Sequence, residues 1–228
     1  MEKEHFAFLE KALGYEFKNK NLLIEALSHP SLKHKSCGEK RDYERLEFLG
    51  DSVLNLLISE AIFKKFPDYP EGKLAKIRAY LVCKDTIGKV GDSVQIADFI
   101  LMSQGEELSG GRLNKNNVEN AIEAIIGAIY LDGGILECSS VIDSLWGSFL
   151  SQEANFDEID PKTSLQEWAQ GNGMVAPTYE LIAKAGVDHS PIFKVMVSVG
   201  GKYKEYGSGK SIKLAQKDAA VRLLSKVK

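Results

Sequence analysis

Apolar residues in the first two thirds of the chain recur at helical spacing. They do so in residues 22–27, 44–65, 72–82 and 117–131, and the segment 44–65 is apolar on nearly every side. Such periodicity predicts helices, and a helix that is apolar all round is predicted to be buried. Residues 103–117 are polar and glycine-rich, which predicts a loop. The pattern therefore predicts a mainly α-helical first part with the helix 44–65 at its centre.

The periodicity changes after Pro161. Residues 193–199, with the sequence FKVMVSV, alternate between apolar and polar positions, as a strand with one buried face does. The flanking segments predict a helix at 164–171, a strand at 178–183, a return strand at 202–207 and a helix at 211–226. The prediction for this part is a small α+β fold of order α-β-β-β-α.

Charge divides the chain at the same place. From Asp160 onward, eleven Lys and Arg stand against six Asp and Glu, a charge of +5, whereas the whole chain carries −3 and the preceding residues therefore −8. A basic part favours a polyanionic partner, although a solvated basic face is also common. The acidic segment 151–160 lacks a periodic apolar pattern and is typical of a linker. We predict domains at residues 1–152 and 160–228, joined by a linker at 153–159.

Several classes of protein are excluded by what the sequence lacks. No run of 18 apolar residues is present, so we expect no membrane-spanning helix. The N-terminal residues MEKEHFAF have no apolar stretch behind a basic start, so we expect no secretory signal. Cys37, Cys83 and Cys138 form no CxxC pair, which argues against a disulfide framework and a zinc site. The expected compartment is the cytoplasm.

Carboxylates interrupt the two most apolar predicted helices. Glu44, Glu47 and Asp51 are spaced i, i+3 and i+7, which brings them onto one stripe of the helix 44–65. Glu123, with Asn120 one turn before it, occupies an equally apolar run. Carboxylates in such a setting repel one another and lose hydration unless a cation or a base compensates.

Two interpretations of these acids remain open at this point. Oxygen donors from two helices form the type of site that Mg²⁺ prefers, and Glu71 at a predicted helix start adds an outer carboxylate. The alternative is a buried salt-bridge network in which Arg45, Arg78 and Lys73 are the partners.

Longer motifs carry a specific resemblance. The run ERLEFLGDSVL (44–54) resembles the signature of the ribonuclease III family, and further segments follow in register: FPDYPEGKLAKIRAYLV (66–82), GEELSGGR (105–112) and NAIEAIIGAIYLDGG (120–134). The resemblance covers essentially the whole chain. It implies that Glu47, Asp51 and Glu123 match the metal-binding and catalytic acids of the family, with Glu44 and Glu71 as accessory acids.

Asn120 departs from the family pattern, which usually has Asp at this position. An amide oxygen still binds Mg²⁺, but the lost negative charge is expected to weaken metal binding. Since the other acids are intact, we expect an active enzyme.

The resemblance also implies a mechanism and an assembly. It implies Mg²⁺-dependent hydrolysis of both strands of double-stranded RNA, with Mn²⁺ as a possible substitute. In this mechanism Asp51 and Glu123 hold or deprotonate the water, and Glu47 and Asn120 complete the coordination. The expected products carry 5′-phosphate and 3′-hydroxyl ends with short 3′ overhangs, and the expected role is processing of rRNA and mRNA precursors. A homodimer is expected in which Phe48 anchors the subunit interface; the alternative for Phe48 is ordinary core.

The last 68 or so residues resemble a double-stranded-RNA-binding domain. Lys210, Lys213 and Lys217 are spaced i, i+3 and i+7 at the start of the final helix, which suits phosphates across a groove. The resemblance assigns minor-groove contacts to Gln166, Glu167 and His189. Two departures are Val187, where the family usually has Pro, and Ile212, where it usually has a basic residue; the second is expected to cost phosphate affinity.

Two other classes of function compete with the nuclease. A non-catalytic RNA-binding protein of the same fold is supported only by Asn120. A carboxylate-bridged di-iron protein requires paired Glu-x-x-His motifs on core helices, and the chain has only Glu2 to His5 at its terminus. Nucleophilic catalysis is disfavoured because no Gly-x-Ser-x-Gly elbow occurs.

Overall fold

The chain divides into two compact units, Met1–Ser151 and Gln152–Lys228. The computed structural model describes residues 2–32, 42–151, 161–185 and 191–227. The predicted linker falls between the second and third of these ranges, so the predicted domain boundaries stay a prediction. No described helix is long and apolar enough to cross a membrane.

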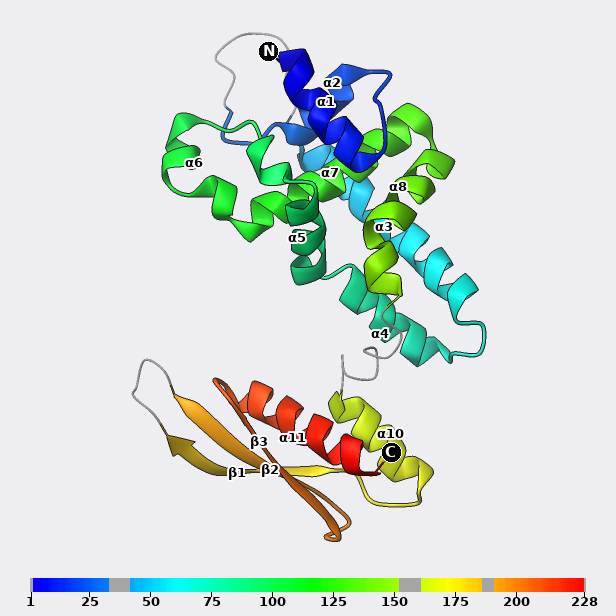
Figure 1. The fold of residues 1–228 in the computed structure, drawn as a ribbon, viewed down its shortest axis with the longest axis vertical. Coiled ribbons are helices and arrows are strands. Elements are labelled where there is room, and N and C mark those ends of the chain that lie inside the picture. Colours follow the sequence, from blue (N-terminus) through cyan, green and yellow to red (C-terminus); the bar gives the residue numbers. More distant parts are fainter. Residues whose placement is uncertain (1, 33–41, 152–160, 186–190, 228) are drawn as a thin grey trace. The chain divides into compact units, whose positions relative to one another are not determined.

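In the described residues of the first unit, helices joined by loops make up the structure (Figure 1), with one isolated β-bridge between Ser28 and Leu101. Its α-helices are α1 (Glu2–Leu13), α2 (Lys20–Leu27), α3 (Glu44–Lys65), α4 (Glu71–Leu81), α5 (Lys84–Ser93), α6 (Gln104–Leu108), α7 (Lys115–Gly133) and α8 (Ile135–Leu150), with the 3-10 turns η1 (Ile96–Asp98) and η2 (Gly111–Leu113). The predicted mainly helical fold is confirmed.

Helices α3 and α7 pack closely at the centre of this unit. Two glycines allow the contact. A Cβ atom at Gly50 would lie 1.7 Å from the carbonyl oxygen of Glu123, and one at Gly127 would lie 2.3 Å from that of Leu46. Because backbone atoms cannot move aside as a flexible side chain does, the two helices can approach this closely only where both residues lack a side chain.

The prediction of a loop across residues 103–117 is wrong in part. The helix α6 and the turn η2 lie within it, and α7 begins at Lys115. Ser103 caps α6, because its hydroxyl accepts a hydrogen bond from the N–H of Glu106 at 3.3 Å. Asn114 caps α7 in the same way through the N–H of Asn116 at 3.0 Å. The prediction overlooked these two capping residues because the segment around them is rich in glycine. Such caps are the local signals at which each helix starts.

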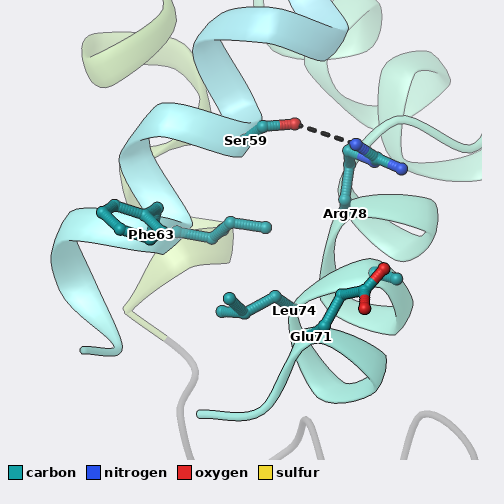
Figure 2. Close-up of a pocket in the computed structure, with 7 residues that line it drawn as sticks. Ser59, Phe63, Glu71, Leu74 and Arg78 are labelled. Carbon is teal, nitrogen blue, oxygen red and sulfur yellow. Dashed lines mark hydrogen bonds between the residues drawn. The ribbon is translucent and has the colours of Figure 1, made fainter. Parts of the chain in front are cut away.

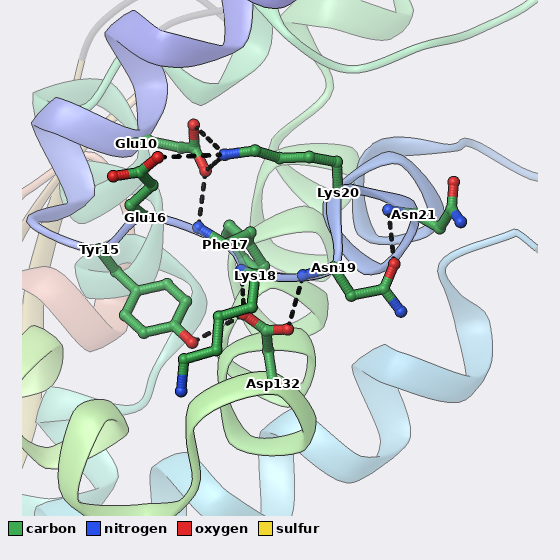
Figure 3. A network of polar contacts seen from close by, with 9 residues as sticks. All are labelled: Glu10, Tyr15, Glu16, Phe17, Lys18, Asn19, Lys20, Asn21 and Asp132. Carbon is green, nitrogen blue, oxygen red and sulfur yellow. Dashed lines mark hydrogen bonds and ion pairs between the residues drawn. The ribbon is translucent and has the colours of Figure 1, made fainter.

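Asp132 joins the C-terminal end of α7 to the segment before α2 (Figure 3). Its carboxylate accepts hydrogen bonds from the Tyr15 hydroxyl at 2.8 Å and from the N–H groups of Lys18 and Asn19 at 2.7 and 2.9 Å. Burial alone would raise the pKa of Asp132, but these three bonds, together with the charge of Lys18, lower it overall. The ionised carboxylate therefore stabilises the fold.

An Asp132→Asn variant is expected to lose about 1–3 kcal/mol of unfolding free energy at pH 7, because its amide N–H would face a backbone N–H. A lowered folded-state pKa gives stability that is present above the ordinary Asp pKa and is lost as pH falls through the folded value. The difference from wild type should therefore shrink below about pH 3.8. Thermal unfolding between pH 7 and pH 3 measures it, with the exposed Asp143→Asn as control. A constant difference across this range would contradict the expectation.

In its described residues, the second unit is a three-stranded antiparallel sheet with two helices. Its elements are α10 (Pro161–Gly171), β1 (Thr178–Ala185), β2 (Ile192–Val199), β3 (Tyr203–Gly209) and α11 (Ile212–Val227), with strand order β1-β2-β3. The alternation in β2 buries Val195, Val197 and Val199, and the last two pack with Ala219 and Leu223 of α11. The predicted α-β-β-β-α order is confirmed.

Candidate functional site

The predicted acids meet where α3 crosses α7. Glu123 is buried at 9% exposure although it carries a carboxylate, Glu47 is half-buried, and Asp51 is exposed. Gly50 lies between Glu47 and Asp51 in sequence and packs against the Glu123 backbone. The close helix crossing therefore brings carboxylates from two distant segments together.

The pKa shifts indicate that these carboxylates act on one another. Burial raises the pKa of Glu123 to about 8, and the charges of Asp51, Glu119 and Glu47 contribute to the rise in that order. Burial likewise raises the pKa of Glu47, with added repulsion from Glu44, Glu119 and Asp51. The cluster formed by Glu47, Asp51 and Glu123 is therefore a region of negative potential.

The salt-bridge alternative finds no support at this cluster. In the described part of the chain, neither Lys nor Arg pairs with Glu47, Asp51 or Glu123. Arg78 instead donates to the Ser59 hydroxyl at 3.2 Å. The described residues also contain no three His, Cys, Asp or Glu side chains already gathered around a metal position.

Glu71 lies elsewhere in the chain. It begins α4 and lines a cavity of about 200 Å³ between α3 and α4, together with Ser59, Phe63, Leu74 and Arg78 (Figure 2). It is not among the charges that raise the pKa of Glu47 or Glu123. Within one chain, Glu71 is thus separate from the acid cluster.

Glu119 was missed by the sequence analysis. It perturbs the pKa of both Glu47 and Glu123, and it forms an ion pair with Lys84 at 3.3 Å. Its spacing of four residues before Glu123 places it on the same stripe of α7, which is the signal that could have identified it. Glu119 adds negative potential to the cluster.

Phe48 projects from α3 into solvent. It is 79% exposed, so its interpretation as ordinary core is wrong for the single chain. It lines a cavity of about 560 Å³ with Glu44, Arg45, Leu49 and the exposed Leu131. An exposed aromatic side chain in an apolar patch is typical of an interface residue.

The predicted RNA-contacting residues of the second unit are exposed where the structure describes them. These are Gln166 and Glu167 on α10, Lys210 before α11, and Lys213 and Lys217 on α11. The hydroxyl of Ser211 caps α11 by accepting from the N–H of Leu214 at 3.2 Å. His189 and Val187 lie outside the described residues. The basic stripe formed by Lys210, Lys213 and Lys217 therefore begins at a capped helix N-terminus, a position that favours the binding of phosphate groups.

Both units match known families. Residues 19–147 match a family described as Ribonuclease-III-like, and residues 161–227 match the double-stranded RNA binding motif. The chain is 55% identical over 224 residues to the Ribonuclease 3 of Rickettsia felis, covering 98% of this chain and 99% of the relative. The chain belongs to the ribonuclease III family.

Other members of the ribonuclease III family are similar to all or part of the chain. The Ribonuclease 3 of Rickettsia prowazekii is 54% identical over 226 residues, covering 99% of this chain and 100% of the relative. The solved nuclease domain of the ribonuclease III of Campylobacter jejuni is 44% identical with a TM-score of 0.59, covering 64% of this chain and 96% of that chain. A second structure of that domain has a TM-score of 0.57 at 46% identity, covers 60% of this chain and 93% of that chain, and concerns flexibility in a region involved in dimer formation.

The ribonuclease III family is metal-dependent, and the donor set of this chain fits a hard divalent cation. Glu47, Asp51 and Glu123 offer carboxylate oxygens and Asn120 offers an amide oxygen. Burial and, to a smaller extent, repulsion between the carboxylates raise the pKa of Glu123 and of Glu47, and a bound cation would offset both effects.

Proposed function

We propose that this chain is a double-stranded-RNA endoribonuclease that hydrolyses both strands with Mg²⁺. The observation that carries the proposal is the buried carboxylate of Glu123, which lies close to Glu47 and Asp51 and pairs with no Lys or Arg in the described residues, in a chain similar to ribonuclease 3 over nearly its whole length. The second unit, which matches the double-stranded RNA binding motif, holds the duplex through its shape and phosphates.

We assign the chemistry to four side chains. The Mg²⁺ ion is held by oxygen ligands from Glu47, Asp51, Glu123 and Asn120. Mn²⁺ can take the place of Mg²⁺ at this site. When bound, the cation supplies Lewis-acid chemistry at the phosphate and makes water easier to deprotonate. Asp51 and Glu123 orient the attacking water and accept its proton. Cleavage leaves 5′-phosphate and 3′-hydroxyl ends. Glu44 and Glu71 have accessory roles.

We further propose that the enzyme is a homodimer acting in the cytoplasm on precursors of rRNA and mRNA. Phe48 and the neighbouring apolar residue Leu131 supply exposed surface for the subunit contact. Gln166, Glu167 and His189 contact the minor groove of the duplex. The described cysteines, Cys83 and Cys138, are free thiols, as a reducing compartment maintains them.

The test uses the purified full-length protein with a long RNA duplex and, separately, one of its single strands. We expect cleavage of the duplex alone, dependence on Mg²⁺, inhibition by chelator, and a lower Mg²⁺ requirement in Asn120→Asp. The alternative is an inactive RNA-binding protein of the same fold. It would be established if the wild-type protein bound the duplex without cutting it and the Asn120→Asp variant cut it. A wild-type protein that neither binds nor cuts the duplex would refute both.

A separate prediction concerns RNA binding by the basic stripe at α11. Replacing Lys217 with Gln is expected to weaken duplex binding at every sequence and to reduce the slope of log affinity against log salt by about 1, because one phosphate contact is lost. Fluorescence anisotropy across a salt series measures both. Lys204→Gln is the matched control, since Lys204 pairs in register with Ser198 on the sheet face away from α11. Equal slopes in wild type and Lys217→Gln would contradict the assignment.

A further inference from the structure

Asp218 on α11 is an acidic residue beside the basic stripe. It directly follows Lys217, one of the three lysines that we propose contact phosphates. A carboxylate repels a polyanion, so the charge of Asp218 by itself would lower the affinity of the second unit for RNA. The position is therefore unfavourable for RNA binding unless the carboxylate has another role there.

The Asp218 carboxylate joins α11 to the end of β3. Its Oδ2 accepts a hydrogen bond from the backbone N–H of Ser208 at 2.9 Å and another from the Nε–H of Arg222 at 3.1 Å. β3 lies at one edge of the sheet, and an N–H group on the outer side of an edge strand finds no partner within the sheet. Asp218 supplies that partner, and Arg222 offsets part of its negative charge.

Two glycines allow the end of β3 to lie directly on α11 (Figure 1). A Cβ atom at Gly207 would lie 2.1 Å from the backbone nitrogen of Ala219, and one at Gly209 would lie 2.7 Å from that of Ala215. Any larger residue at either position would push the strand away from the helix. The bond from Ser208 to Asp218 holds the strand where these glycines let it approach.

Lys210 lies in the short connection between β3 and α11, immediately before Ser211. The Ser211 hydroxyl accepts a hydrogen bond from the N–H of Leu214 at 3.2 Å, and its carbonyl oxygen accepts one from the N–H of Ala215 at 3.0 Å. The connection is therefore fixed at the end that leads into the helix.

The bond from the Ser208 N–H to Asp218 fixes the other end of this connection. A backbone that is already ordered loses less conformational entropy when its side chain binds a phosphate. Without the Asp218 carboxylate, residues 208–211 would gain freedom, and RNA binding would have to order them.

We propose that Asp218 is a positioning residue that holds Lys210 for contact with a phosphate of the RNA duplex. This inference rests on the proposed function, because it concerns how one of the proposed RNA-contacting lysines is presented. The benefit of an ordered Lys210 outweighs the repulsion between the Asp218 carboxylate and the phosphates.

The experiment is a double-mutant cycle of Asp218→Ala and Lys210→Gln in the full-length protein. Fluorescence anisotropy with an RNA duplex, in chelator and across a salt series, measures affinity and its salt dependence. We expect Asp218→Ala to weaken duplex binding by about 3- to 10-fold and to reduce the slope of log affinity against log salt by about 1, as Lys210→Gln does. In the Lys210→Gln background, Asp218→Ala should change the affinity by less than about 2-fold.

Two control variants separate position from charge. In Asp218→Asn, the amide oxygen can still accept the Ser208 N–H but carries no charge, so the duplex should bind at least as tightly as it does to wild type. Glu180→Ala removes a negative charge from the sheet face away from α11, where Glu180 pairs in register with Met196, and it should not weaken binding.

Weakening of equal size by Asp218→Ala with and without Lys210 would indicate a general structural effect and overturn the inference. Unchanged or tighter binding by Asp218→Ala would also overturn it, since the carboxylate would then act through its charge alone. Both outcomes leave the proposed function intact, because the wild-type protein still binds the duplex. A wild-type protein that neither binds nor cuts the duplex would refute the proposed function itself.

Discussion

Replacing Glu123 with Gln is expected to lower duplex cleavage by about 10²- to 10⁴-fold, the range for loss of an acid–base group, while duplex binding persists. Glu123 is the most buried of the clustered acids. Single-turnover cleavage and anisotropy on the same RNA duplex measure the two properties. Glu60→Gln is the control, since Glu60 is an exposed acid on α3 paired with Lys64. Cleavage by Glu123→Gln at the wild-type rate would remove Glu123 from the site.

The same variant is expected to be more stable than wild type when divalent cations are removed. The folded-state pKa of Glu123, about 8, lies above its ordinary value, so ionisation destabilises the fold progressively as pH rises toward 8. Gln never ionises. The melting temperature of Glu123→Gln should therefore exceed that of wild type by a margin that grows from pH 5 to pH 8 and then levels off. Thermal unfolding in chelator tests this, and a margin independent of pH would contradict it.

Gly127→Ala is expected to destabilise the nuclease unit by about 3 kcal/mol, at the upper end of overpacking effects. The new Cβ would lie 2.3 Å from the Leu46 carbonyl oxygen, so α3 and α7 must separate. A loss of this size corresponds to a melting temperature lower by about 6–12 °C. Cleavage should also fall at temperatures where the variant is folded, because separation of the helices moves Glu123 away from Glu47.

Gly88→Ala in α5 is the matched control for this substitution. A Cβ at Gly88 meets nothing within 4 Å, and Ala is favoured over Gly in a helix by about 1 kcal/mol. We expect equal or higher stability and full cleavage in this variant. If Gly127→Ala behaved like Gly88→Ala, the close crossing of α3 and α7 would not be what positions the acids.

Local patterns predicted several of the main elements but gave no ranges for α1, α5 and α8. The helix predicted at 44–65 coincides with α3, because its apolar character and the proline after it are both local signals. The alternation in β2 likewise predicted which face is buried. The short helix α6 was missed because the glycines around it mask a single Ser103 cap. A helix start that is marked by a single capping residue gives only a weak sequence signal in a polar segment.

The sequence by itself determined the family, through motifs that span the chain, and it identified Glu47, Asp51 and Glu123 as candidates. Tertiary structure decided which groups act together. Gly50 and Gly127 bring two helices from distant segments into contact, which adds Glu119 to the acid cluster and leaves Glu71 outside it. Only the packing reveals that Asp132 joins α7 to the segment before α2 and that Phe48 is exposed. Spacing along one helix determines which residues share a face of that helix. Contacts between two helices depend on the side chains and backbone atoms of both helices.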